Sequence, residues 1–83
     1  MTRYDYTLSS RAYKYLARLN RGDRIRIIER IKQLPEGSFV QMEGEKAPTY
    51  RMRVGKYRVI FEKYDNRLLI HVIKIGPRGD VYK

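Results

Sequence analysis

The sequence lacks cysteine, and its 83 residues contain a single histidine, His71. The lack of cysteine excludes a disulfide framework, a cysteine nucleophile and a metal site built on thiolates. No stretch approaches the roughly 20 apolar residues that span a bilayer, and the first residues form no apolar signal region. We therefore expect one domain over residues 1–83 that acts in the cytoplasm, away from membranes and without a metal or other cofactor.

Acidic residues are also scarce, since nine Asp and Glu stand against nineteen Lys and Arg and give a formal net charge of +10. On so small a domain this balance favours a polyanionic partner, namely nucleic acid, an anionic membrane or an acidic protein. A basic surface that is only solvated is the alternative. The carboxylates are scattered, and no pair indicates acid–base chemistry. His71 stands in an apolar run and is expected to be a hydrogen-bonded sheet residue rather than a catalytic one.

The N-terminal half predicts one strand and two helices. Residues 3–8 alternate between apolar and polar side chains, which is typical of a strand. Ser9 or Ser10 is suited to cap a first helix, and residues 20–22 are expected to break it before Asp23 caps a second. The second helix has a predicted apolar face built from Ile25, Ile27, Ile28, Ile31 and Leu34.

The C-terminal half predicts strands. Residues 50–54 alternate between apolar and basic side chains, and an apolar run starts at Tyr57; Gly55-Lys56 between them suits a type II′ hairpin turn. After a turn at 65–67, the run 68–75 is apolar on both faces and is expected to be a central strand. The element order is β-α-α-β-β-β. We predict an α+β fold in which a two-helix hairpin packs on a curved, mainly antiparallel, four-stranded sheet.

The predicted hairpin places arginines together. With a two-residue loop, Val54 pairs with Tyr57, Arg53 faces Arg58, and Arg51 lies on the same face as both. Like charges directly opposite each other destabilise a sheet. A fold gains nothing structural from this cluster, whereas a bound polyanion would balance its charge.

Two motifs resemble a known family. The segment Y-R-M-R-V-G-K-Y-R-V-I-F at 50–61 and the ending I-G-P-R-G-D-V-Y-K at 75–83 resemble the RelE/ParE superfamily of toxins from type II toxin–antitoxin systems. The resemblance implies the RelE-like microbial ribonuclease fold. It further implies the RelE-like mRNA interferase branch, whose members cleave mRNA in the ribosomal A site without a metal.

The resemblance also implies residue roles. The catalytic set would be Arg58, Arg78 and Tyr82, and Arg51 and Arg53 would bind RNA. We expect Lys46 and Lys56 to bind RNA as well. Arg58 and Arg78 would clamp the scissile phosphate during attack by the ribose 2′-OH, and neither is expected to belong to the core. Tyr82 would be a general base or an orienting group, or it would only anchor the tail.

Two other functions stay open at this stage. A ParE-like toxin would poison DNA gyrase without chemistry, and a plain RNA-binding module would bind without cutting. The resemblance implies a cognate acidic antitoxin that forms a hetero-oligomer with the chain, besides the ribosome and mRNA as partners. Opposite charges on toxin and antitoxin would steer their association.

Overall fold

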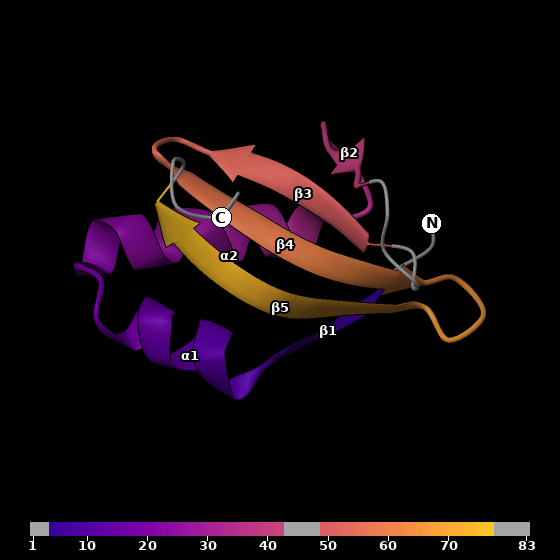
Figure 1. Ribbon diagram of the computed structural model, residues 1–83, viewed down its shortest axis with the longest axis horizontal. Coiled ribbons are helices and arrows are strands. Elements are labelled where there is room, and N and C mark those ends of the chain that lie inside the picture. The colour runs from indigo at the N-terminus through magenta and orange to yellow at the C-terminus, as the bar shows by residue number, and fades with distance from the viewer. Residues whose placement is uncertain (1–3, 43–48, 78–83) are drawn as a thin grey trace.

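The structure, a computed structural model, describes residues 4–42 and 49–77. Along the chain these residues form five strands and two helices (Figure 1). The elements are β1 (Asp5–Leu8), α1 (Ser10–Ala17), α2 (Arg21–Gln33), β2 (Val40–Gln41), β3 (Thr49–Val54), β4 (Tyr57–Tyr64) and β5 (Leu69–Pro77).

The strands form one mixed sheet in the order β1-β5-β4-β3-β2. Only β1 and β5 run parallel, and the other neighbours are antiparallel. The predicted α+β class and mainly antiparallel sheet are confirmed. The number of strands differs from the prediction, because Val40 and Gln41 pair with β3 and add a fifth strand at the edge. Two residues are too few for a period-2 pattern to reveal a strand.

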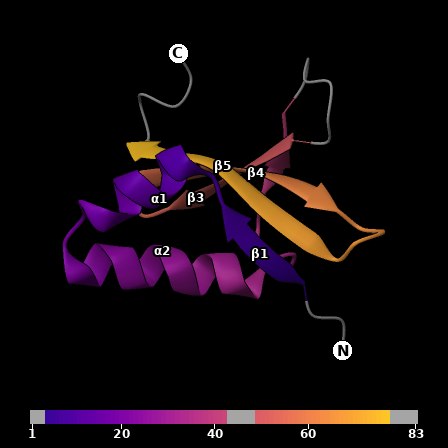
Figure 2. The ribbon, with the colours of Figure 1, turned by 90° about the horizontal axis from the view of Figure 1, so that it is seen from below.

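Both helices pack on the sheet and enclose the core. Figure 2 shows α2 crossing below the sheet, while Figure 1 shows α1 lying along β5. The largest of the fully buried side chains come from α2 and the three long strands, namely Ile27, Ile31, Met52, Val59, Phe61, Ile70 and Val72. Neither of the two described helices is long and apolar enough to cross a membrane.

The helix caps follow the prediction in one case and correct it in the other. Ser9 caps α1, as expected, and its hydroxyl accepts a hydrogen bond from the backbone N–H of Ala12. Asn20 caps α2, where its side-chain oxygen accepts a 2.8 Å hydrogen bond from the N–H of Asp23. The predicted break between the helices exists but lies at 18–20 rather than 20–22, and the predicted cap at Asp23 is wrong. Both Asn and Asp are good caps, so residue type alone does not choose between them.

The predicted apolar face of α2 is correct except at one position. Ile27, Ile31 and Leu34 are buried and Ile28 is half-buried, but Ile25 is 47% exposed. In a helix of about 3.6 residues per turn, Ile25 lies about 200° around the axis from Ile27. It cannot share a buried face with Ile27, so its assignment to the apolar face is wrong.

The β3–β4 hairpin has the predicted register. Val54 pairs with Tyr57 across the two-residue loop, and Gly55 has a positive φ of +58°, as the first loop position of a type II′ turn requires. The prediction that the last apolar run is a central strand is also confirmed, because β5 lies between β1 and β4. His71 on β5 is hydrogen-bonded, as expected, with its Nδ1 2.7 Å from the hydroxyl oxygen of Thr7 on β1.

Candidate functional site

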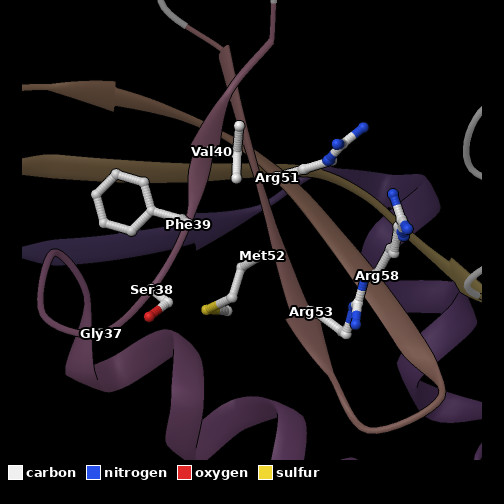
Figure 3. A pocket seen from close by; sticks show the side chains of 8 residues that line it. All are labelled: Gly37, Ser38, Phe39, Val40, Arg51, Met52, Arg53 and Arg58. Carbon is white, nitrogen blue, oxygen red and sulfur yellow. The ribbon is translucent and has the colours of Figure 1, made fainter.

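Three arginines of the hairpin line one groove. Figure 3 shows the side chains of Arg51, Arg53 and Arg58 on one side of β3, while Phe39 and Met52 lie on its other side. The groove has a volume of about 490 Å³. Its lining is completed by Gly37, Ser38 and Val40, so the segment from the end of α2 to β2 forms its remaining wall. We call this the arginine groove.

Strand pairing fixes the arginines relative to one another. Arg53 is the direct cross-strand partner of Arg58, and Arg51 stands two residues before Arg53 on the same face of β3. Neighbouring strands lie about 4.8 Å apart, so the backbones carrying the three guanidinium groups are held at short, defined separations. The cluster that the sequence predicts on one sheet face is therefore confirmed.

The three arginines differ in burial. Arg53 is exposed, Arg51 is half-buried, and Arg58 is only 7% exposed. The expectation that Arg58 stays outside the core is therefore wrong. It lies on β4, an internal strand of the sheet, where its cross-strand partners are Arg53 on β3 and Gly76 on β5. A long side chain buried in this way has lost its rotamer freedom before any ligand binds.

The structure places one further predicted residue apart from these arginines. Lys56 occupies the second loop position of the hairpin, where its Nζ lies 5.7 Å from the centre of the Tyr57 ring, and it does not line the arginine groove. Lys46, Arg78 and Tyr82 lie outside the described residues.

A hydrogen bond between Asp23 on α2 and Tyr57 on β4 connects the hairpin to the helix. The Tyr57 hydroxyl donates a 2.6 Å hydrogen bond to the Asp23 carboxylate, and the Tyr57 ring meets Tyr15 edge to face at 6.3 Å between centroids. That hydrogen bond holds the pKa of Asp23 below its ordinary value, and the charge of Lys56 lowers it further. The same bond, with burial, raises the pKa of Tyr57 to about 12.

Sequence reasoning missed this support. Asp23 is a helix residue and Tyr57 a strand residue 34 positions away, and nothing in either local pattern indicates that they meet. Their contact matters for the site because Tyr57 immediately precedes Arg58. We conclude that α2 fixes the strand from which Arg58 projects.

The described lining of the arginine groove supplies positive charge but no acid or base. Its ionisable side chains are all guanidinium groups, which stay protonated and match phosphate oxygens in a planar, bidentate way. Within the described residues no three His, Asp or Glu side chains gather to hold a metal ion. The groove is suited to bind and stabilise an anion.

Comparison with protein families identifies the class of this chain. The family described as the ParE toxin of the type II toxin–antitoxin system, parDE, matches residues 8–82. The chain belongs to this family of toxins, and its predicted place in the RelE/ParE superfamily is confirmed. Comparison with curated proteins gave no match.

Solved structures have the same fold. The chain is similar to one in the archaeal RelE–RelB complex from Pyrococcus horikoshii OT3, with a TM-score of 0.77, 28% identity, and coverage of 96% of this chain and 99% of that chain. It also resembles the toxin–antitoxin complex RelBE2 of Mycobacterium tuberculosis, with a TM-score of 0.80, 20% identity, and coverage of 96% and 97%. For the intact Escherichia coli RelBE complex the TM-score is 0.75 at 19% identity, with coverage of 89% and 95%.

Proposed function

We propose that this toxin is a ribosome-dependent mRNA endonuclease that acts without a metal. The observation that carries the proposal is the convergence of Arg51, Arg53 and Arg58 on one groove, with Arg53 and Arg58 directly paired. Such a pairing destabilises a sheet on its own, and a phosphate held between the guanidinium groups would offset the repulsion. RNA is the substrate that the resemblance to RelE-like toxins implies.

The proposed reaction is an in-line attack of the ribose 2′-OH on the adjacent phosphorus. The bond from phosphorus to the 5′ oxygen of the next nucleotide breaks, which leaves a 2′,3′-cyclic phosphate and a 5′-OH end. Extra negative charge develops on the phosphoryl oxygens in the transition state. Arg58 is the residue we assign to stabilise that charge, with Arg51 and Arg53 holding the RNA backbone.

The burial of Arg58 supports this assignment. A donor that is fixed in place and shielded from water stabilises developing charge better than one that must reorganise. Arg53 is exposed and can follow the flexible backbone of a bound strand. The difference in burial therefore fits two roles: Arg58 as a preorganised ligand of the scissile phosphate, and Arg53 as a more mobile contact to the RNA backbone.

The proton transfers need other groups. The 2′-OH must lose a proton and the leaving 5′ oxygen must gain one, and the described lining of the arginine groove offers no carboxylate or imidazole. On the resemblance alone, we assign Tyr82 to accept or orient the 2′-OH proton, and Arg78 to clamp the scissile phosphate together with Arg58. A ribosome that holds the mRNA in place would add the large advantage of positioning.

A gyrase poison of the ParE type is the second candidate, and a specific finding favours it. The family that matches residues 8–82 is the family of ParE toxins. In that case the arginine groove would bind an acidic surface of a protein, and no RNA would be cut.

We also propose a cognate acidic antitoxin as partner. The three similar structures described above, from Pyrococcus horikoshii, Mycobacterium tuberculosis and Escherichia coli, are toxin–antitoxin complexes. The net charge of +10 favours an acidic partner, because opposite fields speed association and suppress wrong partners. A segment of the antitoxin that folds on binding would cover the arginine groove.

Induction of the chain in growing cells, followed by primer extension on translated messages, tests the proposed function. The nuclease produces discrete cuts at codon positions. Arg53→Gln reduces them, while Lys32→Gln, which removes an exposed cation that does not line the arginine groove, does not. Growth arrest with DNA-damage signalling and without cuts would reject the nuclease and favour the gyrase poison.

A further inference from the structure

A second groove lies between α1 and the C-terminal part of β5. It has a volume of about 690 Å³, and four of its lining residues are cations, namely Arg11, Lys14, Arg18 and Lys74. The charged residues among its described lining are all basic. We call it the α1 groove. It is separate from the arginine groove, because no residue lines both.

The fold creates this groove by ending β1 early. β1 pairs only with residues 69–72 of β5, so α1 takes the place of a strand along the remaining part of β5 (Figure 1). Ala12 and Leu16 of α1 are buried against the core. The opposite side of α1 is left in solvent at the edge of the sheet.

The cations of α1 form a single stripe. Arg11, Lys14 and Arg18 follow each other at spacings of three and four residues and are all exposed. Residues at those spacings are neighbours on a helix surface, about 5–6 Å apart between Cβ atoms. A row of cations at such regular short intervals matches a ligand with regularly repeated negative charges.

Strand register joins the α1 groove to the arginine groove. Arg58 pairs with Gly76, and Ile60 pairs on one side with Arg51 and on the other with Lys74. Gly76 and Lys74 line the α1 groove, whereas Arg51 and Arg58 line the arginine groove. One strand spacing, about 4.8 Å, therefore separates the two linings at the Arg58–Gly76 pair.

We propose that the two grooves form one track for the phosphate backbone of single-stranded RNA, which passes from the arginine groove over Gly76 and Lys74 to the stripe on α1. This inference rests on the proposed function, since that function places RNA in the arginine groove. An amphipathic helix of a protein partner needs apolar pockets for its anchors. Tyr15, Ile75 and Pro77 add apolar surface to the α1 groove, but its charged lining consists of cations alone, which favours a nucleic acid.

The track is tested by the length and salt dependence of RNA binding. The ligands are 2′-O-methyl RNAs of about 4 and about 16 nucleotides, the range that single-strand binding sites cover. Because the 2′-OH is blocked, no cleavage enters the measurement. The test variant is K14Q/R18Q on the stripe. The control is K32Q/R67Q, two exposed cations at the C-terminal end of α2 and in the β4–β5 turn, so that both double variants lower the charge of +10 by two.

The track predicts a local effect. Each phosphate contact on a single strand contributes a slope of about 0.7 in log affinity against log salt, so loss of two contacts lowers the slope by about 1.4 and the affinity at 0.1 M salt by about 25-fold. We expect this loss for K14Q/R18Q with the longer RNA and little change with the shorter one. We expect K32Q/R67Q to change the affinity for either RNA only by the small effect of a lower net charge.

Other results would overturn the track. An unchanged affinity of K14Q/R18Q for the longer RNA would reject the track. An equal loss of affinity in K32Q/R67Q would also reject it, because the loss would then come from net charge alone. Loss of binding to a polyglutamate peptide without loss of RNA binding would assign the α1 groove to an acidic protein. The pair R11Q/K74Q is measured alongside, and thermal unfolding of each variant confirms that it is folded.

Failure of the track and failure of the proposed function are distinguishable. Arg53→Gln reports on the arginine groove and is expected to weaken both RNA lengths. If wild-type protein cuts mRNA on ribosomes but K14Q/R18Q binds long RNA normally, only the track is rejected. If no cut appears in any assay, the nuclease is rejected whatever the RNA affinities are.

Discussion

Arg53 and Arg58 face each other directly across the β3–β4 hairpin, at the pair next to the one that closes the turn. Like charges at opposed positions of a sheet cost stability. Natural proteins retain such destabilising pairs where function requires them. Substituting a functional residue can therefore raise stability while it lowers activity. The pair therefore predicts opposite effects of one substitution on stability and on activity.

Arg53→Gln should stabilise the fold while weakening toxicity. Removing one charge of the opposed pair is expected to raise the free energy of unfolding by about 0.2–1 kcal/mol at low salt. The gain should shrink as salt screens the pair. Denaturant unfolding measures it, with Lys32→Gln as the control that removes a cation from α2 instead. A variant less stable than wild type at every salt concentration would contradict this account of the pair.

The Asp23–Tyr57 hydrogen bond predicts a stability that depends on pH at both ends of the range. The pKa of Asp23 is lowered in the folded state, so its contribution is present above the ordinary value near 3.9 and is lost as pH falls through the lowered value. The pKa of Tyr57 is raised to about 12, so its contribution is present below about pH 10 and is lost as pH rises through 12.

Thermal unfolding across pH checks these two limbs in variants. Asp23→Asn should flatten the acid limb, and Tyr57→Phe should flatten the alkaline limb. Part of the acid limb should remain in Asp23→Asn, because the Lys63 ammonium and the Tyr4 hydroxyl lower the pKa of Asp65 independently. Asp65→Asn is the matched control, and an alkaline limb that Tyr57→Phe leaves unchanged would contradict the assignment.

Two isoleucines on α2 provide a matched test of its packing. Ile27 is fully buried and Ile25 is 47% exposed. Ile27→Val should lower the free energy of unfolding by about 0.5–1.5 kcal/mol, whereas Ile25→Val should change it by less than about 0.5 kcal/mol. Denaturant unfolding of both variants measures the difference. Equal losses at the two positions would mean that α2 presents a different face to the sheet.

An acidic antitoxin should compete with RNA for the arginine groove. We expect the product of the neighbouring reading frame to release the toxin from ribosomes, and Arg51→Gln/Arg53→Gln to weaken both complexes. The measurement is co-sedimentation of toxin with ribosomes as the antitoxin is titrated. A stable ternary complex in which cleavage continues would exclude this form of inhibition.

Much of the fold could be predicted because its signals are local. The alternation around Gly55-Lys56 defined the register of the β3–β4 hairpin, and the run apolar on both faces defined β5 as central. The start of α2 could not be predicted in the same way, because Asn20 and Asp23 are equally good caps. Asp23 instead accepts a hydrogen bond from Tyr57, a tertiary contact with no local signal.

The sequence predicted which arginines form the site, but not how deeply each arginine is buried. Register alone brings Arg51, Arg53 and Arg58 to one face, and the sequence fixes register once the loop length is known. Burial depends on what lies to either side. Arg58 is buried on a strand that is internal to the sheet, and the order of strands that are distant in sequence is a property of the whole fold.

A purified translation reaction tests the central claim most directly. A defined mRNA is paused on ribosomes, the toxin is added in the Mg²⁺-containing buffer that keeps the ribosomes intact, and the RNA ends are mapped and analysed chemically. The account predicts cuts in the A-site codon, with 2′,3′-cyclic phosphate and 5′-OH ends, that Arg53→Gln diminishes strongly and Lys32→Gln leaves unchanged. Arg58→Lys, which keeps the charge but not the planar fork, should also be impaired. Intact mRNA after incubation with folded wild-type toxin would contradict the account.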